Sequence, residues 1–187
     1  MSLDSLFSFK MITLENANAK AKPILAKAAK RIGKLPNIYG MMANSPSLLE
    51  AYTSSDSAFR SESLFSSAEK EIIYLTISKE NACHYCVAVH SSMADTMSAV
   101  PPLVTEAIRN GTKVPDEKYA VLNKFTRSMV VTRGQPSDQD VEQFISAGYS
   151  ELHVLDIILA IAIKTISNYS NHLFQTPLDK IFQAREW

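Results

Sequence analysis

The chain has 187 residues, of which 46% are hydrophobic and 20% are charged, a composition typical of an ordinary globular domain. Its 19 Lys and Arg residues balance 19 Asp and Glu residues, so no basic excess exists to neutralise a nucleic-acid backbone. The longest uninterrupted apolar run, Ile157 to Ile163, is far shorter than the ~20 residues that span a bilayer, and the N-terminus lacks the pattern of a signal peptide. We therefore expect one domain over residues 1–187, no nucleic-acid or membrane partner, and a cytoplasmic location.

Helix signals follow one another along the chain, and no stretch alternates apolar and polar residues for long enough to predict a sheet. Ser66 followed by Glu69 forms a capping box. Four of the five glycines stand where a helix would end: Gly33, Gly111, Gly134 and Gly148. The predicted helices cover residues 14–31 with a late start or a kink at the internal proline, a short segment after residue 36, and 47–60, 66–79, 83–97, 102–110, 115–133, 137–147 and 151–174. The pattern predicts an all-α fold.

One internal similarity suggests a duplicated helical unit. Sliding the chain so that His172 lies over His90 places residues 149–172 over residues 67–90, and both segments are apolar helices that run into a polar stripe. Residues 149–175 are then a degenerate repeat that has lost its thiols. The alternative is that any two helix pairs can be brought into a rough register.

The residues that can carry chemistry lie within the segment 66–97. On a helix, Cys83, Cys86 and His90 are three and four residues apart, so they share one face. Cys83 stands at the helix start, where free N–H groups and the helix dipole favour a thiolate. His90 is placed to accept a proton from Cys86, directly or through one water. Glu71, on the preceding helix among apolar neighbours, is a candidate for a raised pKa and for orienting His90.

Two other interpretations of the thiol pair remain open. Cys83, Cys86 and His90 supply three of the four ligands that a structural zinc ion needs, and His84 points off their shared face. The two cysteines are alternatively inert residues of a helical core. We expect His153 and His172 to be packing residues.

The spacing of the four candidate residues resembles that of a known family. Glu71, Cys83, Cys86 and His90 match the signature Glu, eleven residues, Cys, two residues, Cys, three residues, His of the AhpD-like (carboxymuconolactone decarboxylase) superfamily. Segments 35–39, 45–49, 138–148 and 168–178 resemble its peroxidase-related branch, so the resemblance covers about residues 33–178. One position departs: the best-studied alkylhydroperoxidases have a second His directly before the second Cys, and here it is Tyr85.

The resemblance implies an AhpD-like helical bundle that reduces hydroperoxides through its cysteine pair. In that scheme Cys86 attacks the peroxide and becomes a sulfenic acid, and Cys83 then forms a disulfide with it. Glu71 and His90 relay protons. The enzyme needs no metal or other cofactor, but an external dithiol or reductase protein must reset the site. The helix dipole by itself favours Cys83 as the nucleophile, and the resemblance favours Cys86.

The resemblance also implies a homo-oligomer, a trimer or a hexamer, and the apolar helix at 151–174 is consistent with an interface. The expected substrates are small organic hydroperoxides or hydrogen peroxide. Three other functions stay open: a carboxymuconolactone-decarboxylase-like enzyme, a general thiol–disulfide oxidoreductase that acts on proteins, and a redox-sensing oligomer without catalysis.

Overall fold

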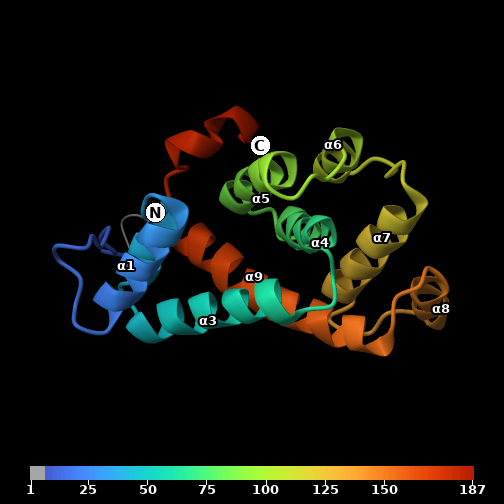
Figure 1. Cartoon of the computed structure of the whole chain (residues 1–187), viewed down its shortest axis with the longest axis horizontal. Coiled ribbons are helices and arrows are strands. Elements are labelled where there is room, and N and C mark those ends of the chain that lie inside the picture. The colour runs from blue at the N-terminus through green and yellow to red at the C-terminus, as the bar shows by residue number, and fades with distance from the viewer. Residues whose placement is uncertain (1–6) are drawn as a thin grey trace.

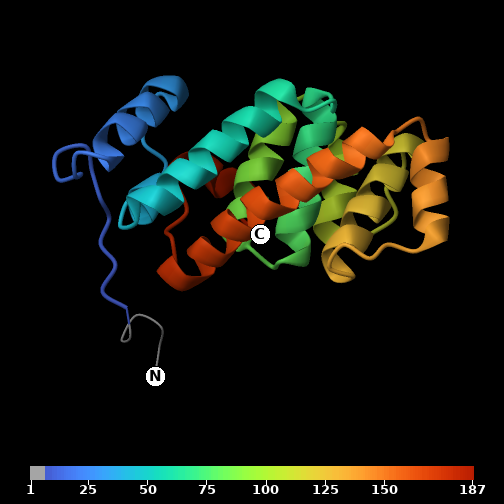
Figure 2. The same ribbon diagram turned by 90° about the horizontal axis from the view of Figure 1, so that it is seen from below.

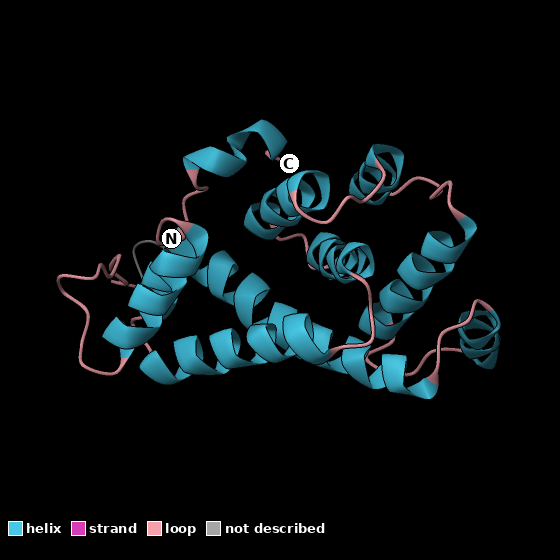
Figure 3. Cartoon of the chain, viewed as in Figure 1, coloured by secondary structure: helices cyan, strands magenta, loops and turns pink. Residues whose placement is uncertain are grey.

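The protein is described by a computed structural model over residues 7–187, and within that range it consists of helices joined by loops, without a strand (Figure 3). The all-α prediction is confirmed for this part of the chain. The helices, labelled in Figure 1, are α1 (Ala21–Ile32), α2 (Asn37–Met42), α3 (Pro46–Glu62), α4 (Ser67–Glu80), α5 (His84–Thr96), α6 (Pro102–Asn110), α7 (Glu117–Val131), α8 (Asp138–Ser146), α9 (Glu151–Phe174) and the 3-10 helix η2 (Lys180–Arg185).

Local capping and stop signals explain most of the helix boundaries. The first predicted helix starts late, at Ala21, because the side chain of Asn18 accepts a hydrogen bond from the Ala21 N–H at 2.9 Å. Pro23 then lies in the first turn, where its missing N–H is not needed. The four predicted stop glycines all have positive φ, between +66° and +91°. Only η2 was not predicted, since six residues of 3-10 helix carry no apolar periodicity.

Helix α4 is the centre of the bundle. Every residue from Glu71 to Ser78 is buried, and α5, α6, α7 and α9 all pack against this helix (Figure 1). A helix that is buried on all sides presents no solvated face, which accounts for the run of apolar residues after the capping box. The polar side chains between Glu71 and Ser78 must therefore find their partners inside the protein.

Helices α3 and α9 lie side by side along one side of the molecule (Figure 2). The carboxylate of Asp156 on α9 accepts a hydrogen bond at 2.9 Å from the N–H of Leu64, in the loop after α3. By length and composition alone α9 could cross a membrane, but a third of its most apolar window is buried within the fold, and core helices pass the same test. Its outer face is apolar and exposed at several positions: Leu152, Leu155, Ile158, Tyr169 and Leu173.

The fifth glycine, Gly40, lies inside α2 and serves close packing. A Cβ atom at this position would lie 2.8 Å from the carbonyl oxygen of Ile12, and the Ile12 N–H donates a hydrogen bond to the Gly40 carbonyl at 3.1 Å. The glycine thus lets the segment before α1 lie directly against α2.

The internal duplication is not confirmed. Residues 67–90 form parts of two helices, α4 and α5, with a turn between them, whereas Glu151–Phe174 is one unbroken helix. The similarity in sequence therefore joins segments whose local structures differ.

The capping box of α4 gives a test of this account. The Ser66 hydroxyl accepts from the Glu69 N–H at 3.3 Å, and Glu69 accepts from the Ser66 N–H at 2.9 Å. We expect Ser66→Ala to lower the free energy of unfolding by ~1 kcal/mol in a denaturant titration. Ser45→Ala is the matched control, because Ser45 precedes α3 without such a bond. Equal losses in both variants would contradict the role of the cap.

Candidate functional site

The corner between α4 and α5 sets the position of the two thiols. Ala82 takes a left-handed conformation, with φ of +52°, and the Cys83 N–H donates back to the carbonyl of Ser78 at 2.9 Å. This turn makes Cys83 the N-cap of α5 and places Cys86 in the first turn of that helix. Both cysteines are buried and carry free thiols.

One amide from α9 contacts both sulfur atoms. Asn171 Nδ2 lies 3.2 Å from Cys86 Sγ and 3.8 Å from Cys83 Sγ. Asn168, one turn earlier on α9, accepts a hydrogen bond at 2.9 Å from Asn81 at the end of α4. These contacts attach α9 to the α4–α5 corner, so the thiol pair lies where three helices meet.

The two thiols differ in their tendency to ionise. The hydrogen bond from Cys83 to Cys86, together with burial, raises the pKa of Cys83. Burial by itself would raise the pKa of Cys86, but the bond from Cys83 and the positive charge of Lys164 outweigh burial and hold the pKa of Cys86 well below its ordinary value. The helix dipole favours a thiolate at Cys83, yet the side-chain environment favours the thiolate at Cys86.

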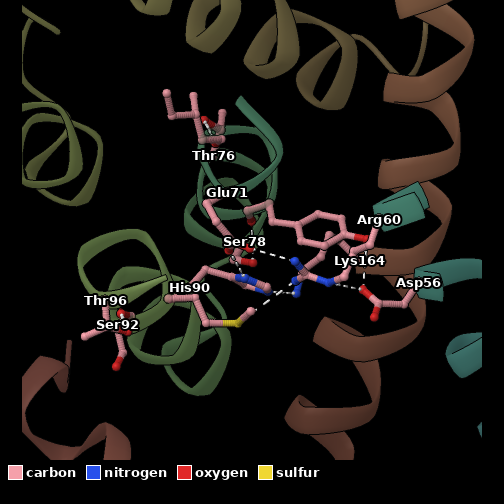
Figure 4. A network of polar contacts seen from close by, with 12 residues as sticks. Asp56, Arg60, Glu71, Thr76, Ser78, His90, Ser92, Thr96 and Lys164 are labelled. Atoms are coloured by element: carbon pink, nitrogen blue, oxygen red, sulfur yellow. Dashed lines mark hydrogen bonds and ion pairs between the residues drawn. The ribbon is translucent and has the colours of Figure 1, made fainter. Parts of the chain in front are cut away.

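His90 is hydrogen-bonded to a chain of charged side chains (Figure 4). The Nδ1 atom of His90 lies 2.8 Å from Oε2 of Glu71, and the other carboxylate oxygen of Glu71 accepts a hydrogen bond at 2.8 Å from Arg60 on α3. Arg60 also pairs with Asp56 at 3.2 Å, and the Tyr74 hydroxyl donates to Asp56 at 3.1 Å. Glu71 and His90 are thus in contact, as the sequence predicted.

The expectation that the pKa of Glu71 is raised is wrong. Burial does disfavour the charged carboxylate, but His90 and Arg60 outweigh burial and lower the pKa of Glu71 to about 2. The apolar neighbours in the sequence gave no sign of Arg60, which reaches Glu71 from another helix. Glu71 is therefore a fixed negative charge in the neutral pH range, which orients His90 and does not itself exchange protons.

His90 was expected to face the Cys86 thiol, but its Nε2 atom contacts Lys164 instead. His90 Nε2 lies 2.8 Å from Nζ of Lys164, a side chain on α9 that is only 1% exposed. Burial and the Lys164 charge together lower the pKa of His90, so the imidazole is neutral near pH 7. Both ring nitrogens are thus occupied, one by Glu71 and the other by Lys164.

Tyr85, at the position of the second His of the best-studied alkylhydroperoxidases, is not part of this line. Its hydroxyl donates to Asp179 at 2.6 Å, and Lys34 pairs with the same carboxylate at 3.3 Å. Burial and the Asp179 charge raise the pKa of Tyr85. Its role is to tie α5 to the segment that follows α9.

The arrangement does not suit a metal ion. Within residues 7–187 no group of three or more His, Cys, Asp or Glu side chains is arranged to hold one. His90 in particular has no free nitrogen to offer beside the two sulfurs. A hollow of about 510 Å³ between α1 and α3 is lined by residues such as Lys27 and Glu50 and by none of the thiol-site residues.

Sequence reasoning did not find Lys164, Asn171 or Arg60. Arg60 is one of several charged residues near the end of its helix, and nothing local distinguishes it. Lys164, Asn168 and Asn171 did carry a signal, because they follow one another on one face of an otherwise apolar helix. The two His residues set aside as packing residues lie elsewhere: His153 caps α9 by accepting from the Ser150 N–H at 3.0 Å, and His172 stacks on Tyr169.

Solved structures of other proteins share this architecture. A peroxidase-related protein of Ralstonia eutropha JMP134, described as an alkylhydroperoxidase AhpD core, superposes with a TM-score of 0.83 at 19% identity over 93% of both chains. A peroxidase-related protein of Silicibacter sp. TM1040 gives 0.81 at 20% identity, over 96% of this chain and 94% of that one. The chain has the AhpD-like fold.

A third structure with the AhpD-like fold has a different activity. The debrominase Bmp8, in a Cys-to-Ala variant bound to 2,3,4-tribromopyrrole, gives a TM-score of 0.79 at 17% identity, over 96% of this chain and 95% of that one. No protein-family model and no curated protein matches the sequence. The AhpD-like bundle that the resemblance implied is thus confirmed, and its chemistry has to be argued from the site.

The difference between the two thiols can be measured. In Cys83→Ser, whose hydroxyl can replace the donated hydrogen bond, we expect the ultraviolet absorbance of the Cys86 thiolate to titrate below the ~8.5 of a free cysteine. Cys86 then stays ionised at pH 7 and is protonated only as the pH falls through that lowered pKa. Cys86→Ser is the matched variant, and its remaining thiol should titrate at a higher pH. The reverse order would contradict the assignment.

Proposed function

We propose that this chain is an AhpD-like enzyme that reduces hydroperoxides with its thiol pair and an external dithiol. The observation that carries the proposal is the buried pair itself, in which Cys86 favours the thiolate and Cys83 keeps its proton. A thiolate beside a protonated thiol is the starting state for peroxide reduction, since the first attacks and the second completes a disulfide.

The proposed cycle balances with these groups. The Cys86 thiolate attacks the terminal oxygen of the hydroperoxide, the O–O bond breaks, and the alkoxide takes a proton to leave as an alcohol. Cys86 is now a sulfenic acid, and the Cys83 sulfur displaces its oxygen as water to form the disulfide. A dithiol then reduces the disulfide and is itself oxidised. Small organic hydroperoxides and hydrogen peroxide are the proposed substrates, and no metal or organic cofactor takes part.

Debromination is the second candidate, because Bmp8 shares the fold and was captured with a brominated pyrrole. The substrate that is turned over separates the two candidates. We also propose a cytoplasmic location, because an external dithiol has to keep the pair reduced.

A turnover assay tests the proposed activity. With a dithiol in excess, we expect wild type to reduce an organic hydroperoxide over many cycles and Cys86→Ser to lose that turnover by orders of magnitude. Without the dithiol, Cys83→Ser should consume one hydroperoxide per chain and stop at the sulfenic acid, because no second thiol is there to form the internal disulfide.

Other substrates define the outcomes that contradict the peroxidase. Turnover of a brominated pyrrole or of a protein disulfide, but not of a hydroperoxide, would assign the thiols to those reactions. Activity on a lactone acid that survives both Cys-to-Ser changes would indicate a decarboxylase-like enzyme. One oxidation per wild-type chain without turnover would indicate a redox sensor.

We further propose that the chain assembles through the outer face of α9 with copies of itself, as a trimer or a hexamer. Leu155 is 60% exposed and Ile158 is 50% exposed, on the face opposite the thiol-site residues. The equal numbers of acidic and basic residues allow identical surfaces to approach without long-range repulsion. An obligate interface of this kind buries more than ~2,000 Å² in total.

Sedimentation tests the assembly. We expect wild type to sediment as an oligomer at micromolar concentration, and Leu155→Glu to shift it toward the monomer, because a carboxylate would be buried in the interface. Leu103→Glu is the matched control, since Leu103 on α6 is 72% exposed and lies on another helix. A monomeric wild type, or an equal shift in both variants, would overturn the proposal.

A further inference from the structure

We propose that Lys164 is the acid of the thiol site: it holds the proton released by Cys86 and returns it to the oxygen that leaves during peroxide reduction, while His90 positions its ammonium group. The second half of this inference rests on the proposed function. The first half, stabilisation of the thiolate, holds for any reaction that uses Cys86 as a nucleophile.

The hydrogen bonds of His90 leave it no capacity to act as the base for Cys86. Glu71 is an ionised carboxylate and can only accept, so the proton of the imidazole is on Nδ1, 2.8 Å from Glu71 Oε2. The Nε2 lone pair then accepts from the Lys164 ammonium group at 2.8 Å. Figure 4 shows His90 between Glu71 and Lys164. His90 could take the Cys86 proton only by giving up its bond to Lys164.

Lys164 is buried, and its ammonium group contacts neutral groups. It is only 1% exposed, and its Nζ lies 2.8 Å from Nε2 of the neutral His90 imidazole. The same Nζ lies 5.2 Å from the centre of the Tyr74 ring, a favourable contact for a cation. A buried ammonium group is stabilised by anions nearby, and an ionised Cys86 adds one to the carboxylates of Glu71 and Asp56.

The other ionisable groups around the pair are engaged with each other or stay neutral. From α3, Asp56 and Arg60 pair with each other, and Arg60 also pairs with Glu71 from α4. Burial raises the pKa values of Tyr52 on α3 and Tyr74 on α4, so both hydroxyls stay neutral.

The two remaining ionisable groups are on α5. Cys83 keeps its proton, and His90 is neutral. Lys164 shares a face of α9 with Asn171, whose Nδ2 lies 3.2 Å from Cys86 Sγ, and its positive charge lowers the pKa of Cys86 more than His90 does. When a turnover has left Lys164 as the neutral amine, the proton of Cys86 therefore has one destination among these side chains, which is Lys164.

The proton balance closes over the proposed cycle. When the thiolate attacks, Lys164 gives its proton to the departing alkoxide and becomes a neutral amine, and the sulfenic acid forms. The thiol proton of Cys83 leaves with the hydroxyl of the sulfenic acid as water when the disulfide closes. Reduction by the dithiol delivers two thiol protons, and the one on Cys86 passes to Lys164 to restore the thiolate–ammonium pair.

The first experiment titrates the Cys86 thiolate in a Cys83→Ser background. We expect Lys164→Met to move the midpoint upward by at least one pH unit, which is a tenfold loss of thiolate at pH values below the midpoint, and His90→Gln to move it by less. Lys118→Met is the matched control, because Lys118 also lies over a tyrosine ring, at 4.9 Å, and pairs with Glu69 away from the thiols. An unchanged midpoint in Lys164→Met, or a larger shift in His90→Gln, would overturn the proposal.

The second experiment separates the role of Lys164 as a proton donor from the effect of its positive charge on the thiol pKa. At a pH above both midpoints, where wild type and variant carry equal thiolate, we expect Lys164→Met to react at the wild-type rate with iodoacetamide, which requires no proton. Its oxidation by an alkyl hydroperoxide should be at least tenfold slower than that of wild type. Equal rates with the hydroperoxide would remove the acid role.

Two controls keep the test decisive. Lys164→Gln repeats both measurements if the Met variant does not show the wild-type circular dichroism. If wild type itself does not react with hydroperoxides, the proposed function fails, and the thiolate titration still decides whether Lys164 stabilises Cys86.

Discussion

The carboxylate of Glu71 lies in the centre of the bundle without exposed surface, and two other helices supply its hydrogen-bond partners. Arg60 reaches it from α3 and His90 from α5, and Lys164 from α9 joins through His90. Removing one partner from a buried ion pair typically costs ~3–5 kcal/mol, because a charge is then left without compensation. The charge of Glu71 therefore fixes how α3, α5 and α9 are placed around α4.

The same groups determine which of the two thiols ionises more readily. Glu71 fixes the proton of His90 on Nδ1, so the unprotonated Nε2 atom can accept a hydrogen bond from Lys164. The positive charge of Lys164 in turn favours the thiolate of Cys86. Cys83, although it stands at the start of α5, donates a hydrogen bond to Cys86 and is the less acidic of the two. Local helix geometry thus matters less at this site than side chains brought in from distant parts of the chain, because in a buried site charges interact without screening by water.

Helix α9 joins the site to the proposed assembly. Its inner face carries Lys164 and Asn171, and its outer face carries exposed apolar side chains such as Leu155. A helix that is covered on one side by polar site residues and on the other by a neighbouring subunit is held more firmly than one exposed to solvent. The geometry at the sulfurs would then depend in part on the oligomer, since Asn171 contacts both thiols.

The sequence by itself determined the helices and the core of the site. Glycines with positive φ, the capping box at Ser66 and the proline positions are local signals, and each acts within one turn of helix, so they can be read without a fold. The spacing of Cys83, Cys86 and His90 placed them on one face for the same reason. Only the tertiary structure decided the ionisation of the site, because Arg60 and Lys164 come from helices far away in the sequence, and the pKa of a buried group depends on every charge near it in space.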